Sequence, residues 1–579
     1  MIRNILENSI KTALWELKID KSNPVINLEH PEDLSHGDYS TNIAMVLAKQ
    51  VAQNPRELAE KIVAEIKERL PKEISKIEVA GPGFINFYLS PEFFVLQNKE
   101  ILKVGKKFGL NKNLKGERTI IEYTDPNPFK EFHIGHLVPN SIGESVATIL
   151  EANGAKVMRA CYQGDLGLHI AKNIWAILKD NSIKDFQKKT LNEKVNYLGK
   201  MYAKGAEVYE NPQGNEKKEI EELNKKIYEK SEKEINKIYE WGRKVSLEYF
   251  DSIYKVLGTK FDRLFFESET QELGRQIVEK NIGKVFEKSN GAIIFKGENY
   301  GLHTRVFINS EGIPTYEAKD LGLAKKKYDF YHYDKSLIVT GNEQKEYTKV
   351  MLKAMSFVFP EFAEKTKVIT NGFLSLSSGK MSSRTGKVVP ATSLITDTEN
   401  RVIEKMTARD INEKEKKEIA QKIAVGALKY SILKQVNGKD IVFDFDKSLS
   451  FEGDSGPYLQ YSYARAKSIL RKAKEERVKS RFDPSQIKSQ FDWASINILE
   501  KLLYRFPEIV ERAGNEYSPH YIATYLIELA SSFNSFYATG KIVDKKDAES
   551  SYKVALTEAF SIVLKNGLNL LGIQAPEKM

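Results

Sequence analysis

The sequence predicts a multidomain α/β protein. A Rossmann-like parallel-sheet domain with a helical insertion is expected between a small N-terminal α/β domain and an all-helical C-terminal domain. The chain has 579 residues, enough for several domains of ordinary size. In its middle part, buried-strand patterns alternate with helical patterns, as parallel crossover units require. After Val389 the patterns are helical to the end of the chain.

Composition limits the class of protein. Hydrophobic residues make up 41% and charged residues 29%, the balance of a globular protein with buried cores. No stretch approaches the roughly 20 uninterrupted apolar residues that a membrane span needs. An acid, Glu7, and an amide, Asn4, lie where a signal peptide has an apolar run. We therefore expect a cytoplasmic protein without a membrane partner.

Cysteine content and charge narrow the partners further. The one cysteine, Cys161, forms no intramolecular disulfide and no cysteine-based zinc cage, so we expect no structural metal. The formal net charge is +10 and the isoelectric point is near 9.0. This surplus favours a polyanionic partner, because Lys and Arg side chains that contact phosphates release condensed counterions. A solvated basic surface explains the same surplus, so charge leaves the question of nucleic-acid binding open.

The first domain is expected over residues 1–114. Residues 55–70 place their apolar side chains on one helical face. Residues 84–89 follow a Gly-Pro-Gly turn and alternate like a half-buried strand. These patterns predict a separate small α/β domain.

The second domain is expected over residues 115–390. Between its first two strands, a Pro-rich turn leads into a helix at about 140–151, which Asn153 and Gly154 end. A strand, a helix and a second strand in this order form a parallel crossover unit of a doubly wound sheet. Strand patterns appear at residues 119–123, 157–162, 292–295 and 336–339.

Two other regions are helical. Residues 184–255 carry charged helices, for example over 216–240, and we interpret them as a solvated insertion. Residues 391–579 form a helical region in which Gly567 and Gly572 break the final apolar run.

Residues 122–136, with the sequence EYTDPNPFKEFHIGH, carry most of the chemical information. They lie at the carboxyl end of a strand and the amino end of a helix, where free N–H groups and the helix dipole favour phosphate. His133 and His136 add donors, Gly135 lets a nucleotide approach the backbone, and Lys130 adds a positive charge. The segment holds no nucleophile paired with a base. It is typical of a triphosphate site that works by positioning and electrostatic stabilisation, although two surface histidines can also flank a glycine by chance.

A second constellation occupies residues 379–389, with the sequence GKMSSRTGKVV. This basic loop is rich in hydroxyl groups and flanked by glycines, so it can close over phosphates as a clamp. Standing alone, the same loop would be interpreted as a solvated surface turn.

Both constellations resemble signatures of class I aminoacyl-tRNA synthetases. His133-Ile134-Gly135-His136 matches the HIGH motif, and the longer string from Glu122 resembles the arginyl branch. The resemblance implies ATP, with its Mg²⁺, as a substrate and charge stabilisation by four catalytic residues: His133, His136, Lys130 and Lys380. It implies ATP contacts from Gly135, His133, His136, Lys380, Met381 and Ser382.

The second loop resembles the KMSKS motif of the same class, with two departures. Ser383 and Arg384 replace its second lysine and last serine, a loss that is common in the arginyl branch, where the lysine before the histidine pair is thought to substitute. That lysine is Lys130. Val138 and Pro139 stand where the branch usually has Arg and Ser; Pro139 is tolerated in the first turn of a helix.

An acidic recess is expected for the amino acid. Arginine's guanidinium is planar and permanently charged, and it suits bidentate contact with a carboxylate. Tyr316 and Asp320 lie four residues apart, hence on one face if helical, although a capped surface helix would show the same spacing. The resemblance implies that Asp320 binds the guanidinium and Tyr316 helps to orient it. It implies further arginine contacts from Glu122, Asn127 and Gln344.

The C-terminal region from about residue 446 resembles the helical anticodon-binding domain of the arginyl branch, and the N-terminal domain resembles its extra domain, which touches the tRNA elbow. Aromatic side chains interleaved with Arg and Lys can stack on unpaired bases, although helical spacing assigns more than half of these tyrosines to core packing. The candidates for tRNA binding are Tyr458, Tyr461 and Arg465. We expect a monomer.

Together these features predict ATP-dependent ligation of L-arginine to its tRNA through an arginyl-adenylate, and the resemblance implies that activation needs tRNA. Three alternatives stay open: a class I synthetase for another amino acid, a small-molecule nucleotidyltransferase, or a non-catalytic tRNA-binding relative. A cysteinyl enzyme needs zinc ligands that one cysteine does not supply, and a glutamyl pocket should be basic. A nucleotidyltransferase would not need the long basic helical tail, and a non-catalytic relative should have lost the histidines and Lys380.

Overall fold

The computed structural model describes residues 2–19, 24–180, 188–377, 389–406, 412–481 and 498–579. The chain forms two compact units. The first consists of residues 1–108, 466–506 and 531–563, and the second of residues 109–465, 507–530 and 564–579.

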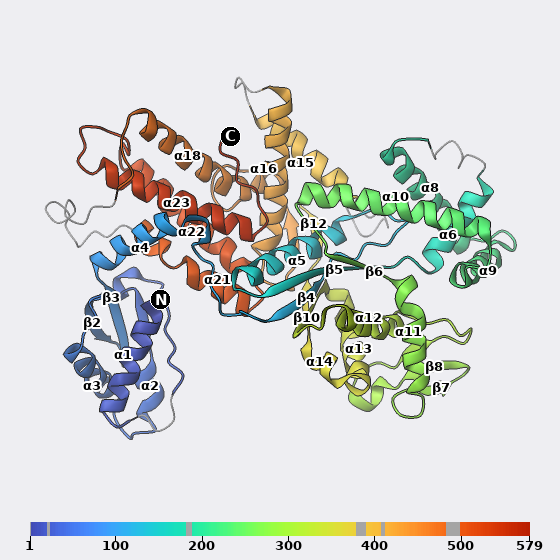
Figure 1. The fold of residues 1–579 in the computed structure, drawn as a ribbon, viewed down its shortest axis with the longest axis horizontal. Helices are drawn as coiled ribbons and strands as arrows, with labels where there is room; N and C mark the ends of the chain where they lie inside the picture. Colours follow the sequence, from blue (N-terminus) through green and yellow to red (C-terminus); the bar gives the residue numbers. More distant parts are fainter. Residues whose placement is uncertain (1, 20–23, 181–187, 378–388, 407–411, 482–497) are drawn as a thin grey trace. The chain divides into compact units, whose positions relative to one another are not determined.

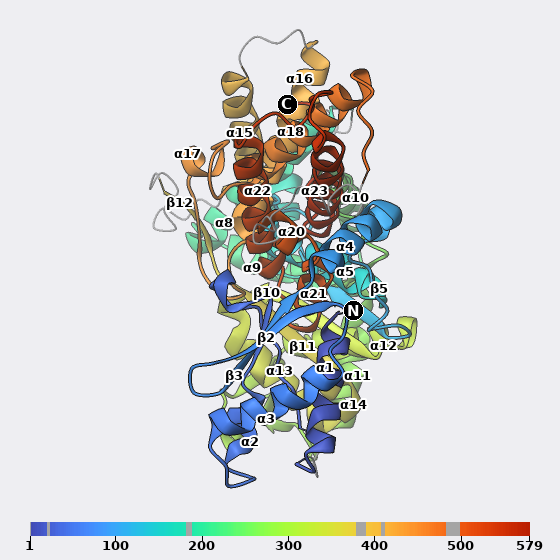
Figure 2. The same cartoon turned by 90° about the vertical axis from the view of Figure 1, so that its left-hand side faces the viewer.

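The N-terminal part of the first unit is an α/β layer pair (Figures 1 and 2). Its antiparallel sheet has the order β1-β3-β2, with β1 at Tyr39–Thr41, β2 at Ile74–Ala80 and β3 at Phe84–Leu89. The β2–β3 hairpin confirms the predicted turn, because Gly81 and Gly83 both have positive φ, at 52° and 131°. The inward side chains of β3 share a core with the helices α1 (Ile2–Glu16), α2 (Ile43–Ala48) and α3 (Pro55–Glu68).

Tyr504, from the C-terminal part of the chain, completes this core. The ring of Tyr504 lies 5.4 Å from that of Phe93 and 5.6 Å from that of Phe94, centroid to centroid. Both phenylalanines belong to α4 (Pro91–Val104), on which α20 (Ile498–Leu503) packs. Close by, Lys501 Nζ lies 3.3 Å from Asp38 Oδ1. The helices α22 (His520–Ala538) and α23 (Ser550–Leu570) also contribute to this unit, where Phe533 and Phe560 stack at 3.8 Å.

The second unit is built on a five-stranded parallel sheet with the order β11-β10-β4-β5-β6. The central strand β4 has completely buried isoleucines, as a strand covered on both faces requires. The crossover from β4 to β5 through α5 confirms the predicted Rossmann-like unit. The strands are β4 (Arg118–Glu122), β5 (Lys156–Gln163), β6 (Arg263–Phe266), β10 (Lys335–Gly341) and β11 (Thr366–Asn371).

Helix α5 begins earlier than predicted, at Ile134, and ends at Ala152. His133 is its N-cap, so Pro139 lies in the second turn and not in the first. Proline has no N–H, and the carbonyl of Gly135 therefore receives no bond from position 139. The prediction was wrong because the capping histidines, not the proline, determine where the helix starts.

The helical insertion differs from the prediction in two ways. The expected helix over 216–240 is two helices, α9 (Glu216–Glu229) and α10 (Lys233–Leu257), because Lys230 is left-handed at φ 52°. The insertion is also not merely solvated. A Cβ atom at Gly242 of α10 would lie 2.2 Å from the ring of Phe129, so α10 packs directly on the loop that follows β4. Two more helices complete this region, α6 (Leu168–Lys179) and α8 (Leu191–Glu210).

The chain after Val389 is not entirely helical, in contrast to the prediction. β13 (Ile441–Phe443) pairs in parallel with β12 (Leu374–Leu376). Gly567 lies inside α23, where a Cβ atom would come within 2.5 Å of Leu526, and only Gly572, with φ 62°, follows the helix end. The helices here are α15 (Ala391–Lys405), α16 (Glu413–Leu433), α17 (Phe445–Ser448), α18 (Gly456–Glu475) and α21 (Phe506–Asn515).

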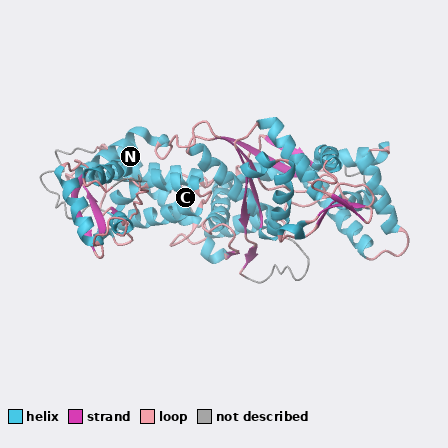
Figure 3. Cartoon of the chain, turned by 90° about the horizontal axis from the view of Figure 1, so that it is seen from below, coloured by secondary structure: helices cyan, strands magenta, loops and turns pink. Residues whose placement is uncertain are grey.

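Among the described residues, the remaining elements of the second unit are a further sheet and four α-helices. A three-stranded antiparallel sheet is formed by β7 (Glu287–Ser289), β8 (Ala292–Phe295) and β9 (Arg305–Ile308). The helices are α11 (Glu267–Lys280), α12 (Tyr316–Tyr331), α13 (Lys345–Val358) and α14 (Pro360–Lys365). Figure 3 shows that the strands gather in separate groups within a mainly helical chain. Within the described ranges, no helix is both long and apolar enough to cross a membrane.

Candidate active site

The loop between β4 and α5 has a strained backbone. Thr124, Asp125 and Phe129 all lie in the left-handed region, with φ at 82°, 45° and 66°. Such conformations cost about 1–3 kcal/mol each and persist only where the surroundings enforce them. Here the N–H of Tyr162 donates to Asp125 Oδ1 at 2.7 Å, and Phe129 donates its N–H to Ser246 Oγ at 2.9 Å. Neighbouring elements β5 and α10 therefore hold the loop in one shape.

The two histidines of the loop form a reciprocal cap. Nδ1 of His133 accepts the N–H of Gly135 at 3.1 Å, and Nδ1 of His136 accepts the N–H of His133 at 3.2 Å. Their rings stack with centroids 3.7 Å apart and planes 20° apart. Because Nδ1 is an acceptor in both rings, each neutral ring carries its proton on Nε2.

Both rings are neutral at physiological pH. Burial lowers the pKa of His133 to about 4, and the positive charge of Lys130 lowers it further. Burial also holds the pKa of His136 well below its ordinary value, with contributions from His133 and Lys130. Two uncharged imidazoles with Nε2–H groups can donate hydrogen bonds to an anion without first losing or gaining a proton.

Lys130 lies next to this pair. Its Nζ is 5.2 Å from the ring centroid of Tyr202. Burial lowers the pKa of Lys130, and the charge of Lys172 lowers it further. A partly desolvated ammonium near two neutral donors is a cation that a phosphate group would stabilise. The structure thus brings together three of the four predicted catalytic side chains.

The fourth, Lys380, lies outside the described residues, as do Met381 and Ser382. The described residues that follow them in sequence are bonded to the histidine turn. Val389 accepts the N–H of Ile134 at 3.1 Å, and the N–H of Ala391 donates to the carbonyl of Phe132 at 2.9 Å. The chain after the second constellation therefore runs beside the first.

A buried group of charges lies at the carboxyl end of β4 and along α12. Glu122 Oε2 accepts a bond from Lys327 Nζ at 2.8 Å, and both side chains are almost completely buried. Asp320 Oδ2 accepts the hydroxyl of Tyr347 at 2.5 Å. Burial raises the pKa of Asp320 to about 7. The bond from Tyr347 opposes this rise, and the negative charge of Glu122 adds to it.

The other predicted arginine contacts are less closely grouped. Tyr316 is 60% exposed, and its ring faces Lys319 Nζ at 5.1 Å. Gln344 is exposed at the start of α13. Asn127 packs against the backbone of Gly164, where a Cβ atom would come within 2.3 Å of its Oδ1. The tyrosine that reaches Asp320 is therefore Tyr347, not Tyr316.

Sequence reasoning missed Tyr347, Lys327 and Ser246. Lys327 follows Asp320 by seven residues, which places the two side chains on one face of a helix, two turns apart. This spacing could have predicted that Lys327 lies near the site. Tyr347 and Ser246 lie on helices whose pairing with the site depends on tertiary packing. No local pattern marks them.

The predicted tRNA-binding residues lie on α18. The guanidinium of Arg465 lies 4.7 Å from the ring of Tyr461 and also donates to its hydroxyl at 3.2 Å. The hydroxyl of Ser455 accepts the N–H of Tyr458 at 3.1 Å. Phe451 meets Tyr461 edge-on at 6.0 Å. An aromatic ring covered by a guanidinium is a surface on which a base can stack.

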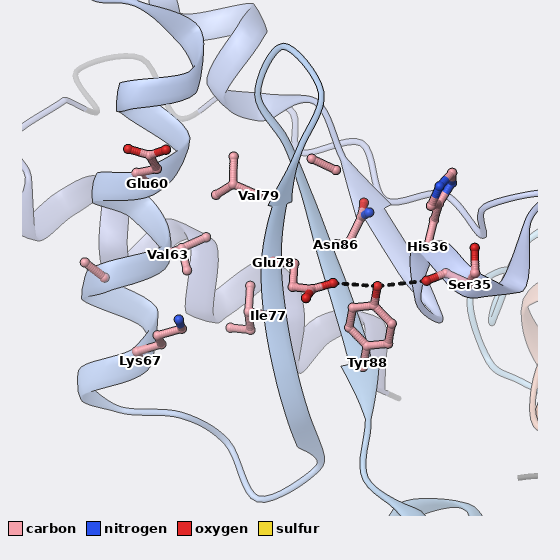
Figure 4. Close-up of a pocket in the computed structure, with 12 residues that line it drawn as sticks. Ser35, His36, Glu60, Val63, Lys67, Ile77, Glu78, Val79, Asn86 and Tyr88 are labelled. Carbon is pink, nitrogen blue, oxygen red and sulfur yellow. Dashed lines mark hydrogen bonds between the residues drawn. The ribbon is translucent and has the colours of Figure 1, made fainter. Parts of the chain in front are cut away.

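The N-terminal domain carries a pocket of about 660 Å³ beside β2, β3 and α3 (Figure 4). The hydroxyl of Tyr88 lies 2.8 Å from Glu78 Oε2 and 2.9 Å from the carbonyl oxygen of Ser35. Side chains of both charge signs line the pocket, among them His36, Glu60, Lys67 and Glu78. In the part of the chain that the structure describes, no group of three or more His, Cys, Asp and Glu side chains is placed to hold a metal ion.

Three family models match the chain. They are described as "Arginyl tRNA synthetase N terminal domain" over residues 3–89, "tRNA synthetases class I (R), catalytic domain" over residues 97–445, and "DALR anticodon binding domain" over residues 459–579.

Relatives match over 95% or more of their length. The arginine–tRNA ligase of Levilactobacillus brevis is 31% identical over 566 residues, covering 95% of each chain. That of Clostridium botulinum strain Langeland is 31% identical over 587 residues, covering all of both chains.

Two solved structures share the fold. The arginyl-tRNA synthetase of Thermus thermophilus has a TM-score of 0.79 at 24% identity, with all of both chains covered. That of Plasmodium falciparum has a TM-score of 0.79 at 20% identity, covering 100% of this chain and 99% of its own.

Proposed function

This chain belongs to the arginyl-tRNA synthetase family, and from that premise we propose which residues carry out its reaction, the ligation of L-arginine to tRNA. The proposal rests on two observations: the pair of capped, neutral histidines beside Lys130 in the loop after β4, and the acidic group of Glu122 and Asp320 at the carboxyl end of the same strand. The first gives donors for phosphate, and the second gives acceptors for a guanidinium.

In the first step the carboxylate of arginine attacks the α-phosphate of ATP, giving arginyl-adenylate and pyrophosphate. The nucleophile is already ionised, so the site needs no general base. His133 and His136 donate Nε2–H bonds to phosphate oxygens, and Lys130 and Lys380 neutralise charge that moves onto the leaving group. The backbone at Gly135 lies against the nucleotide, and Mg²⁺ arrives as part of the ATP substrate. Met381 and Ser382 complete the ATP contacts.

The acidic group selects the amino acid. Asp320 binds the guanidinium, because a half-buried carboxylate beside an aromatic hydroxyl can form a charge-assisted pair with it. Glu122 and Asn127 contact the amino end of the substrate, and Tyr316 and Gln344 line its sides. Lys327 donates to Oε2 of Glu122, so the other oxygen of this carboxylate is left for the amino group of the substrate.

In the second step a hydroxyl of the 3′-terminal ribose of the tRNA attacks the carbonyl carbon of the arginyl-adenylate, forming the ester and breaking the anhydride bond, with release of AMP and the hydroxyl proton. Tyr458, Tyr461 and Arg465 bind tRNA within the helical region of residues 391–579, from about residue 446, and the N-terminal domain of residues 1–114 contacts it elsewhere. The catalytic domain spans residues 115–390, with its insertion at about 184–255. The enzyme acts as a monomer in the cytoplasm.

Pyrophosphate exchange with each of the twenty amino acids, with and without tRNA, tests this assignment. Exchange is expected with arginine, and only in the presence of tRNA. Exchange with lysine or glutamate but not with arginine would overturn the amino-acid assignment. Exchange with arginine in the absence of tRNA would overturn only the tRNA requirement.

A further inference from the structure

Two helices meet through the side chains of Tyr347 and Asp320. Tyr347 is the third residue of α13, and Asp320 is the fifth residue of α12. The tyrosine hydroxyl donates to Asp320 Oδ2 at 2.5 Å. Among the residues that the structure describes, Tyr347 is the one hydrogen-bond donor to this carboxylate, which leaves Oδ1 for a ligand. The guanidinium of Arg305 lies 5.6 Å from the centroid of the Tyr347 ring. This cation therefore faces the tyrosine ring and not the Asp320 carboxylate.

The nearby lysines are already paired. Lys327 donates to Glu122 at 2.8 Å, and Lys319 donates to Glu267 at 2.7 Å. Asp320 therefore has a hydroxyl, not a dedicated cation, as its direct partner. The charged and titratable groups that face Asp320 come from β4, β5, α11, α12, α13 and the loop after β4; they are Glu122, Tyr162, Glu267, Lys327, Tyr347 and Asp125.

We propose that Tyr347 is a positioning residue for arginine selection, which holds the Asp320 carboxylate ionised and in one orientation so that its free oxygen can accept the guanidinium. This inference rests on the proposed role of Asp320. Tyr347 itself does not touch the substrate. It acts by donating to one carboxylate oxygen, and a hydrogen bond to an ionised acceptor is stronger than one to a neutral acceptor.

The contact gives arginine binding a pH dependence. Burial, Glu122 and Glu267 raise the pKa of Asp320 to about 7, while the Tyr347 hydroxyl and Lys327 act in the opposite direction. The guanidinium stays charged at every accessible pH, so arginine competes with a proton for Asp320. The KM for arginine should therefore rise as pH falls below about 7 and be constant well above it. Without the hydroxyl, the pKa of Asp320 moves up, and the rise in KM begins at a higher pH.

The test is steady-state aminoacylation by the full chain between about pH 6 and pH 9. Tyr347→Phe is expected to raise the KM for arginine about tenfold at pH 7 and by a clearly smaller factor at the alkaline end, with the KM for ATP unchanged. Tyr333→Phe is the matched control, because this tyrosine is 1% exposed and its hydroxyl has no hydrogen-bond partner within the described ranges. A KM for Tyr347→Phe that is normal, or raised equally at every pH, would refute the inference.

Asp320→Asn separates this inference from the proposed function. If that variant keeps a normal KM for arginine, the proposed guanidinium contact fails and the role of Tyr347 fails with it. If Asp320→Asn loses arginine binding while Tyr347→Phe has the wild-type pH profile, only the positioning role fails.

Calorimetry gives a second measurement that does not depend on turnover. Arginine is titrated into the enzyme with tRNA at pH 7, in buffers of different ionisation enthalpy. With a pKa of about 7 for Asp320, wild type should release about half a proton on binding arginine, and Tyr347→Phe should release nearly one. Equal proton release by the two enzymes would contradict the proposal.

Discussion

The N–H of His133 donates to Nδ1 of His136 at 3.2 Å, within a pair of imidazoles stacked 3.7 Å apart. The bond gives each histidine two tasks on different atoms. Nδ1 caps the helix, and Nε2 carries the proton that can be donated to a ligand. Substitutions that preserve one nitrogen at a time can therefore separate the structural task from the chemical one.

His133→Asn should keep the cap and lose the chemistry. Asparagine places an oxygen near the position of Nδ1 and is a favoured N-cap residue, so the free energy of unfolding should change by less than about 1 kcal/mol. Loss of the Nε2 donor should lower kcat by about 10²–10³. Urea unfolding and single-turnover adenylate formation measure the two effects. His133→Gln should give the reverse pattern, with weaker capping and more residual activity; equal activity in both variants would contradict the division of tasks.

Lys130→Met should reduce adenylate formation by about 10²–10³, because the variant keeps the aliphatic stem beside Tyr202 and removes the charge. Pyrophosphate exchange at saturating tRNA measures the rate of adenylate formation. Lys172→Met is the control, since Lys172 pairs with Glu210 at 3.2 Å and its loss should leave exchange within about threefold of wild type. Near-normal exchange by Lys130→Met would show that this lysine does not substitute for the one missing from the second loop.

Lys327→Met should destabilise the second unit by about 3–5 kcal/mol, because it leaves the buried carboxylate of Glu122 without its partner. Adding Glu122→Gln to the same chain should recover much of this loss. Lys325→Met, on the same helix, removes an exposed pair with Asp329 and should cost less than about 1 kcal/mol. Urea unfolding compares the three, and similar midpoints for Lys327→Met and Lys325→Met would argue against a buried pair.

Ser246→Ala should loosen the strained loop, because the buried N–H of Phe129 loses its acceptor at 2.9 Å. An unsatisfied buried donor costs about 1–3 kcal/mol, and part of this cost should appear as a lower kcat. Ser252→Ala is the control on the same helix, since its hydroxyl bonds only the carbonyl of Tyr249 among the described residues. If both serine variants have the same activity, α10 does not support the loop in the way the contact suggests.

Local chemistry made part of this structure predictable. The Gly-Pro-Gly hairpin and the strand–loop–helix unit around the histidines were predicted because positive φ, capping and periodicity act over a few residues. The expected start of α5, at about residue 140, was wrong, because the cap formed by His133 begins the helix at Ile134. The break at Lys230 was also missed, since no glycine marks it.

Contacts between segments that are far apart in the chain could not be predicted from the sequence. β13 is three residues long and pairs with a strand far from it in the chain, which no periodicity reveals. Spacing within one helix places Tyr316 on the same face as Asp320, but the tyrosine that bonds the Asp320 carboxylate, Tyr347, reaches it from another helix. Asp320 itself was predicted from the resemblance of its motif to the family. Its neighbours depend on how α12 and α13 pack.

The ring of Tyr504 within the core of the N-terminal domain has a consequence for biosynthesis. The ribosome makes the phenylalanines around it roughly 400 residues before the tyrosine. At about 5–20 residues per second, the nascent domain waits for some tens of seconds with that position unfilled. A fragment ending at residue 108 should therefore expose the vacant site to solvent and bind hydrophobic dyes or chaperones, which the finished chain should not do.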